Sequence, residues 1–329
     1  LFVGCMLAFA ACGDDADDTD NTPTPDPVYK VDLGGELAWH PVSAVYNAGV
    51  VTATTAAAGA EAGAAAALTW GVTGDVTWAL IDPLEVLSGI TPTPLATGSI
   101  DPNDCEPSAA YGSTCDWSAT DVDITSVTLG LIMLIQDTRT TALFETTNMG
   151  TASGTSLAAW KDSGVGATDL TALVVSIESA TKLSELIDGG TTTYADMKSY
   201  GYMFGMTVTS DLKPVGGVTV TPGDFTGVTH TMRYPNATLD GVGASTAIGL
   251  GFFLYAPDSA TTVNTSWTAC QKDSEGACDT DADYTWGDVA AAGTQPNTAF
   301  VLTYLANEAC DNDKTSTPES APTVGTCGS

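Results

Sequence analysis

Alternating apolar and polar positions recur through the second half of the chain and predict β-strands. In residues 202–209, Tyr-Met-Phe-Gly-Met-Thr-Val-Thr, every even position is apolar. This period of two is typical of a half-buried strand. Turn residues follow at 211–214, and further strands are predicted at 217–221, 228–234, 248–255 and 299–306.

The first half of the chain contains a nearly continuous apolar run from Val127 to Ile135. This run is too short to cross a membrane, which needs roughly 20 apolar residues. It therefore predicts a central strand that is covered on both faces.

Between these two regions the apolar spacing changes to a helical period. Apolar residues at 170, 173, 174, 177, 180 and 187 predict a helix that Gly189 and Gly190 end. A second, short helix is predicted from Tyr194 to Ser199.

These patterns predict a mainly β protein with one or two β-sandwich-like units and a short helical connector. The first β unit is expected at 29–150, the partly helical connector at 151–199 and the second unit at 200–309. Residues 310–329 are expected to form a disulfide-pinned C-terminal tail.

The charge of the chain limits its partners. It has 40 acidic and 9 basic residues, a formal net charge of −31. Such a surface repels phosphate backbones and anionic lipid head groups, which excludes nucleic acid as a partner. The need for solubility and self-repulsion is by itself a sufficient explanation of this acidity.

The N-terminal segment carries an export signature. Residues 1–11 are apolar and end in Ala10-Ala11 before Cys12, and Ala10-Ala11-Cys12-Gly13 resembles the lipobox of bacterial lipoproteins. That resemblance implies a truncated signal peptide at 1–11 and lipidation of Cys12. Phe9 stands where the family prefers Leu, and Cys5 is a competing site.

An acidic and proline-rich segment follows the lipobox. Its aspartates repel one another and its alternating prolines keep the chain extended, so residues 12–28 are expected to form a lipidated tether. In polyproline geometry the tether holds the body up to about 50 Å from its anchor. This design implies a membrane-anchored lipoprotein of the cell envelope, at the outer membrane or the cell surface.

Six further cysteines form three pairs that are close in sequence. Because an even number in an exported chain indicates disulfides, we predict Cys105–Cys115, Cys270–Cys278 and Cys310–Cys327. A zinc site needs closer cysteine pairs or nearby histidines, and the sequence has neither.

Two segments of the second unit resemble a known domain family. Residues 205–209 and 214–220 are similar to the opening strands of carboxypeptidase-regulatory-like, transthyretin-type β-sandwiches, and Thr246–Phe252 is similar to a later strand of that family. The resemblance implies immunoglobulin- or transthyretin-type sandwiches with a non-catalytic accessory or structural role. It carries over no functional residue.

The sequence shows no motif of a catalytic site. His230 is in phase with Val228, Met232 and Tyr234, and His40 precedes a proline at a strand end, so both are interpreted as structural. There is no nucleophile elbow, zinc-protease motif, phosphate loop or dinucleotide fingerprint. The 40 acidic residues offer many carboxylate pairs, so a hydrolase that uses two carboxylates stays open as an alternative.

Two further features are candidates for binding. Asp279, Asp281, Asp283 and Asp288 alternate in a turn and form a fragment of a calcium signature, without its glycine and its glutamate. The bland interpretation, a solvated acidic loop, is the favoured one. Exposed tryptophans, Trp286 first among the seven, are candidates for stacking on sugar rings.

The sequence thus favours a non-catalytic structural or binding lipoprotein, displayed at the bacterial cell envelope through its lipid anchor. The alternative is a secreted hydrolase of polysaccharide or protein. A carbohydrate or protein ligand is compatible with either, and calcium is the one cofactor that the sequence suggests.

Overall fold

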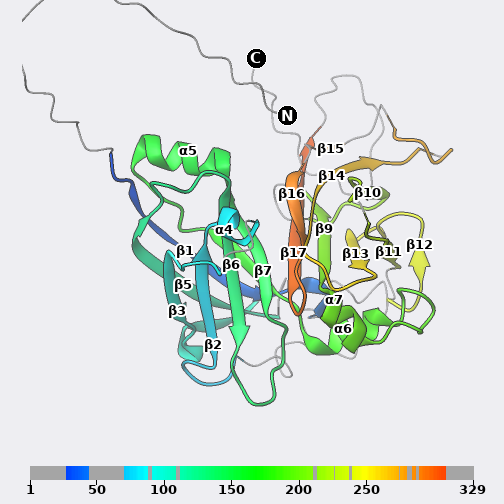
Figure 1. The fold of residues 1–329 in the computed structure, drawn as a ribbon, viewed down its shortest axis with the longest axis horizontal. Helices are drawn as coiled ribbons and strands as arrows, with labels where there is room; N and C mark the ends of the chain where they lie inside the picture. Colours follow the sequence, from blue (N-terminus) through cyan, green and yellow to red (C-terminus); the bar gives the residue numbers. More distant parts are fainter. Residues whose placement is uncertain are drawn as a thin grey trace, which may run out of the picture.

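The computed structural model describes residues 27–43, 70–87, 91–108, 112–209, 213–225, 227–236, 239–273, 275–279, 284–286 and 289–308. These residues are mainly β, with few helices, as the sequence predicts. They form three sheets, which we call the β1 sheet, the long sheet and the β14 sheet (Figure 1).

The β1 sheet has the strand order β4, β5, β1, β8. Within it β8 runs parallel to β1, and the other neighbours are antiparallel. The strands are β1 (Lys30–Trp39), β4 (Cys105–Ser108), β5 (Gly112–Asp123) and β8 (Leu170–Val174).

The long sheet runs through the molecule in the order β12, β11, β13, β9, β17, β7, β6, β2, β3, and β15 pairs with β17 beside this path. Its strands are β2 (Val76–Ile81), β3 (Ala96–Ser99), β6 (Gly130–Asp137), β7 (Thr147–Ser153), β9 (Tyr202–Val208), β11 (His230–Pro235), β12 (Val242–Gly243), β13 (Phe252–Pro257), β15 (Tyr284–Trp286) and β17 (Ala299–Glu308). The sheet therefore contains strands from both sequence regions that the apolar pattern separates.

The β14 sheet has the order β10, β14, β16, with β10 (Val218–Pro222), β14 (Val263–Gln271) and β16 (Val289–Thr294). The helical elements are α4 (Pro83–Leu87), the 3-10 turn η1 (Pro102–Asp104), α5 (Gly154–Ser163), α6 (Ile177–Ser184) and α7 (Tyr194–Tyr200).

Two hydrophobic cores lie between these layers. The first core joins the β1 sheet to β2, β6 and β7 and continues to α6 and α7. The second core lies between the β14 sheet and the strands β9, β11, β13 and β17. The β1 sheet thus covers one end of the long sheet, and the β14 sheet covers the other end.

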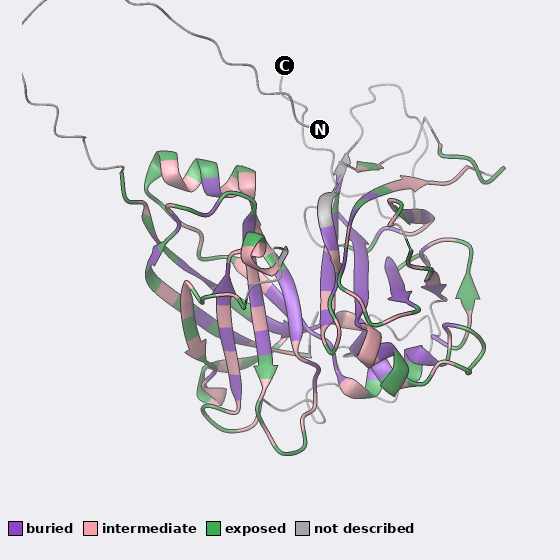
Figure 2. Cartoon of the chain, in the orientation of Figure 1, coloured by how far each residue is buried: buried purple, intermediate pink, exposed green. Residues whose placement is uncertain are grey.

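Strand β9 contributes to both cores. Its even residues Tyr202, Phe204, Met206 and Val208 lie in the first core, whereas Met203 lies in the second. All seven residues of β9 are buried, so the prediction of a half-buried strand is wrong for this segment. The strand is covered on both faces because the two cores meet across it, as the buried centre of Figure 2 shows.

Gly205 is required where β9 faces the second core. A Cβ atom at this position would lie 1.9 Å from the ring of Phe253 on the neighbouring strand β13. Glycine lets the phenylalanine ring lie directly against the backbone of β9, which fills the space between the sheets.

Most of the apolar run at 127–135 lies in a central strand as predicted, since β6 lies between β7 and β2, although the strand begins only at Gly130. Its cover is less complete than expected. Leu131, Met133 and Ile135 are buried in the first core, whereas Ile132 and Leu134 on the other face are half-buried.

The predicted helix at 170–187 is partly wrong. Residues 170–174 form β8, which adds parallel to β1 from Gly35 to Trp39, and the helix α6 begins only at Ile177. Ser176 caps α6 by accepting a hydrogen bond from the backbone N–H of Ser179. The spacing of Leu170, Leu173 and Val174 fits a short buried strand as well as a helix.

The second predicted helix is confirmed as α7, which has a capping box between Thr193 and Asp196. Helix α5 has no counterpart among the predicted elements. Ser153 caps its start, and Gly164 ends it in the left-handed conformation with a φ of 69°. Its single buried residue, Leu157, explains why the apolar pattern does not indicate it.

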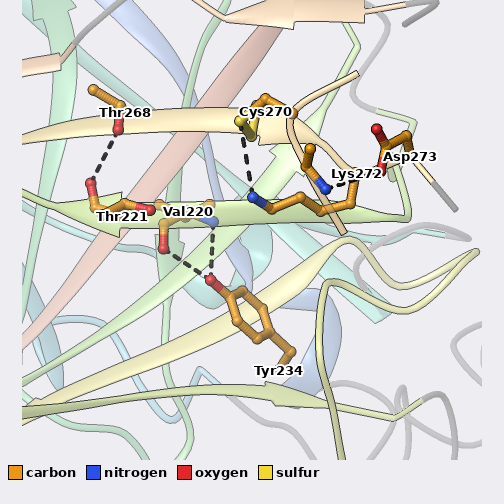
Figure 3. The surroundings of a disulfide bond; sticks show 9 residues. Val220, Thr221, Tyr234, Thr268, Cys270, Lys272 and Asp273 are labelled. Carbon is orange, nitrogen blue, oxygen red and sulfur yellow. Dashed lines mark hydrogen bonds between the residues drawn. A yellow bond between two sulfur atoms is a disulfide. The ribbon is translucent and has the colours of Figure 1, made fainter. Parts of the chain in front are cut away.

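Two of the three predicted disulfides are present. Cys105–Cys115 joins directly paired residues of β4 and β5, with Cα atoms 4.0 Å apart. Cys270–Cys278 closes the loop after β14 (Figure 3). Cys310 and Cys327 lie outside the described residues.

Near the second disulfide, Tyr234 links two layers. Its hydroxyl accepts a hydrogen bond of 2.9 Å from the Val220 N–H and donates one of 2.8 Å to the Val220 carbonyl (Figure 3). The side chain thereby ties β11 of the long sheet to β10 of the β14 sheet.

The two cores should lose stability together when β9 is truncated. Phe204→Ala removes a ring from the first core, and we expect a loss of about 3–5 kcal/mol in the free energy of unfolding. Met203→Ala removes its neighbour from the second core, and we expect about 2–5 kcal/mol.

Urea unfolding followed by tryptophan fluorescence measures both losses. Ile248→Ala is the control, since Ile248 is 88% exposed and should change stability by less than about 0.5 kcal/mol. Each variant should show a single transition. Unfolding of one half while the other stays folded would contradict the coupling through β9.

Candidate ligand-binding groove

An open groove of about 880 Å³ lies on the β1 sheet and its border with the long sheet. Pockets that bind small ligands typically have volumes of about 300–1,000 Å³. The lining comes from residues 32–36 of β1, Trp78 of β2, residues 97–99 of β3, Asp101 and Asp104 beside η1, residues 116–120 of β5, and Thr168, Asp169 and Thr171 at the start of β8.

The strand pattern exposes polar side chains along this groove. On β5, Asp116, Ser118 and Thr120 are exposed, whereas Trp117 between them is buried. On β1, Asp32 and Glu36 are exposed in the same way. Successive side chains of a strand point to opposite faces, so one face builds the core and the other lines the groove.

Glycines shape the groove where chains approach closely. Gly35 has a φ of +153°, and a Cβ atom there would lie 1.8 Å from the carbonyl oxygen of Leu170. A Cβ atom on Gly98 would lie 2.3 Å from the indole of Trp78. These positions allow β8 and Trp78 to pack against neighbouring backbone that carries no side chain.

The groove is strongly acidic. Six carboxylates line it, and no Lys or Arg of the described chain does; the acids are Asp32, Glu36, Asp101, Asp104, Asp116 and Asp169. Asp32 accepts a hydrogen bond from the backbone N–H of Asp121. The backbone N–H of Asn103 donates to Asp101 and holds the pKa of that carboxyl below its usual range.

Two of these carboxylates face each other across neighbouring strands. Glu36 of β1 and Asp116 of β5 are direct partners in the antiparallel register, and both are exposed. Like charges in directly opposed positions destabilise a sheet. The pair therefore opposes folding when no positive group lies between the two side chains.

Trp78 and Trp117 form the base of the groove. Their ring centroids lie 5.4 Å apart at 60°, and each side chain is only 4% exposed. Trp117 Nε1 is buried without a hydrogen-bond partner among the described residues. The rings support the groove from below and leave little face free for stacking.

Most of the seven tryptophans are buried, which leaves few candidates for stacking on sugar rings. Trp39, Trp70 and Trp267 are also at most 4% exposed, and Trp160 and Trp286 are half-buried. Trp267 fills the second core, where its Nε1 donates a 2.9 Å hydrogen bond to the Ala292 carbonyl. Most tryptophans are therefore core residues, as expected for a sandwich, and Trp286, the first candidate for stacking on a sugar, is half-buried.

The predicted calcium ligands are only partly described. Asp279 follows the Cys270–Cys278 loop, and its backbone N–H donates to the Gln271 carbonyl. Asp281, Asp283 and Asp288 lie outside the described residues, as does the predicted lipidation site Cys12. Within the described residues, no three Asp, Glu, His or Cys side chains gather as a metal site requires.

The two histidines occupy different environments. His40 is fully buried against the rings of Phe204 and Phe252, and burial lowers its pKa to about 3. Its Nδ1 accepts a hydrogen bond from the backbone N–H of Val42. His230 is half-buried beside the ring of Tyr255. Neither lines the groove.

One signal of the groove is present in the sequence, although none of the predicted sites includes it. The run Thr114-Cys115-Asp116-Trp117-Ser118 alternates polar residues with large apolar ones. This is the pattern of a strand with one wet face. The other walls come from distant segments, which the pairing of strands in the β1 sheet and the packing of β3 against β5 bring together.

Comparisons with known proteins give two distant structural likenesses. No protein-family model and no curated protein matches it. Among solved structures it is similar to a mutant of the shaft pilin SpaA from Lactobacillus rhamnosus GG, at 8% identity and a TM-score of 0.19, over 86% of this chain and 100% of that one. It is also similar to a streptococcal ancillary pilin, at 7% identity and a TM-score of 0.20, over 84% and 69%. Likenesses at these TM-scores carry no functional argument.

Among the helices of the described residues, none combines the length and the apolar character that crossing a membrane requires.

The opposed carboxylates give a test of the groove's electrostatics. Glu36→Gln should raise the free energy of unfolding by about 0.2–1 kcal/mol at low salt, because it removes one of two like charges. Glu106→Gln is the control, since Glu106 is exposed on β4 opposite the neutral Thr114. Urea unfolding near pH 7 measures both. A Glu36→Gln variant less stable than the Glu106→Gln variant would contradict the repulsion.

Burial of His40 predicts a pH dependence of stability. The folded protein keeps His40 neutral down to about pH 3, whereas the unfolded chain takes up a proton near the ordinary value of 6.5. Stability from this group is thus fully present above pH 6.5, and each unit below it costs up to about 1.4 kcal/mol.

His40→Asn keeps an acceptor for the Val42 N–H and removes this titration. Urea unfolding between about pH 7.5 and pH 4.5 should show a steeper loss of stability in the wild type than in the variant. Parallel curves for the two proteins would show that folding does not lower the pKa of His40 and would contradict this prediction.

Proposed function

We propose that the protein is a non-catalytic, lipid-anchored binding protein of the bacterial cell envelope, and that its acidic groove is the binding surface. The observation that carries this proposal is the groove itself. It is open, it is lined by exposed carboxylates and hydroxyls, and it lies on a sheet whose other face is firmly packed.

The order of segments along the chain supports display of the groove. The lipobox-like Ala10-Ala11-Cys12-Gly13 comes first, and the acidic, proline-rich segment up to residue 28 follows it. β1 begins at Lys30 and contributes Asp32 and Glu36 to the groove. An extended tether of this length would hold the groove up to about 50 Å from the membrane.

The acids of the structure favour binding over hydrolysis. A carboxylate hydrolase needs a general acid whose pKa is raised, beside a second carboxylate that stays ionised. Burial raises the pKa of Glu145, but this residue lies outside the groove and forms a 3.0 Å ion pair with Lys198. In the groove, the pKa of Asp101 is shifted in the opposite direction.

Calcium binding by Asp279, Asp281, Asp283 and Asp288 stays a prediction. It would add a cation site beside the second disulfide, distant in sequence from the groove. The proposed binding function does not depend on it.

The anchor is tested by Cys12→Ser. Loss of the lipid should move the protein from the membrane fraction to the soluble exported fraction, since one polar residue replaces the anchor. Cys5→Ser is the matched control and should leave the protein with the membranes. A Cys12→Ser protein that still sediments with membranes after a carbonate wash would contradict the anchor.

A further inference from the structure

We infer that the groove binds a cationic polypeptide segment whose basic residues are spaced along an extended chain. This inference rests on the proposed function, because it takes the groove as the binding surface and specifies the chemical class of its ligand.

The charge of the groove determines the sign of the charge on its ligand. Six carboxylates line it without any Lys or Arg of the described chain, so an anionic ligand is repelled. A single divalent cation fits poorly, since no three of the described acidic, His or Cys side chains gather as metal ligands. The carboxylates are instead spread along the groove, which suits several separate positive charges.

The opposed pair Glu36 and Asp116 gives an independent indication. Their direct pairing destabilises the empty β1 sheet, and functional sites are where such local conflicts are retained. A guanidinium or ammonium group between the two carboxylates would replace repulsion by two ion pairs. Thr171 lies beside Glu36 on β8 and adds a hydroxyl acceptor to the same position.

The strand geometry predicts the spacing of the positive charges. Asp32 and Glu36 lie four residues apart on β1, which corresponds to about 13 Å along a strand. A ligand in extended conformation has the same rise per residue. Basic residues four positions apart on such a ligand lie on one face and reach Asp32 at one end and the Glu36–Asp116 pair at the other.

The walls fit a peptide better than a sugar. Sugar sites commonly use an open aromatic face, and Trp78 and Trp117 are only 4% exposed. The hydroxyls of Ser118 and Thr120 are exposed and can bond to backbone amides and carbonyls.

A binding titration of the full exported chain tests this inference. The probe is a blocked nonapeptide of serine and glycine with lysine at its first, fifth and ninth positions. The same peptide with glutamate at those positions, a neutral hexasaccharide and Ca²⁺ alone are the comparison probes. We expect the lysine peptide to bind and to weaken when NaCl rises from about 50 mM to about 500 mM.

Variants assign the binding to the groove. Glu36→Gln combined with Asp116→Asn should weaken the lysine peptide about tenfold, since each exposed ion pair contributes modestly. Asp32→Asn tests the other end of the groove and should also weaken binding of the lysine peptide. The matched control combines Glu178→Gln with Asp162→Asn, which remove the same charge from exposed positions on α6 and α5. The control should change the affinity by less than about twofold.

Three results would overturn the inference. Equal weakening in the control pair would mean attraction by the net charge of −31 alone. Equal affinity for a nonapeptide with its three lysines adjacent would show that the groove does not require the proposed spacing of basic residues. The third result is binding of the hexasaccharide or Ca²⁺, but not of the lysine peptide, that the Glu36 and Asp116 double variant loses. It would reject the peptide as the ligand and keep the groove as the binding surface. If no probe binds, the proposed function fails as well.

Discussion

The burial of β9 on both faces is the constraint on which the rest of the structure depends. Its neighbours share the condition: on β13, Leu254 lies in the first core and Tyr255 in the second. On β17, Val301 and Leu302 are divided in the same way. A strand in this position must be apolar at successive residues, and its side chains become part of both cores. The two sandwich-like ends of the molecule are therefore parts of one packed body.

This arrangement explains where a groove can form. Strands at the centre have no face left for solvent, whereas β1 and β5 bury one face in the first core and leave the other free. Polar side chains on the free face then rest on a well-packed layer that contains Trp78 and Trp117. A rigid base of this kind keeps exposed carboxylates at fixed separations, as selective binding requires.

The sequence predicts the mainly β architecture, most strands of the second half, α7 and two disulfides, because these depend on local periodicity and spacing. The sequence-based prediction fails at β8, because the spacing of Leu170, Leu173 and Val174 fits a helix as well as a short buried strand. Pairing with β1 makes this segment a strand. The prediction also misses the groove. Residues 32–36, 97–104, 116–120 and 168–171 are far apart in the chain. Strand pairing joins the three segments of the β1 sheet, and packing of β3 of the long sheet against β5 brings residues 97–104 beside them. The site residues that the sequence favours lie largely outside the described segments.

The double hydrogen bond between Tyr234 and Val220 has a consequence for contacts between copies of the chain. β10 is the outer strand of its sheet, and the Val220 N–H and carbonyl point away from β14, where a strand of another molecule could add. A tyrosine hydroxyl from the same chain already occupies both groups. A strand of another molecule therefore finds no free backbone group at Val220 on which to pair, so this edge is protected against aggregation at its centre.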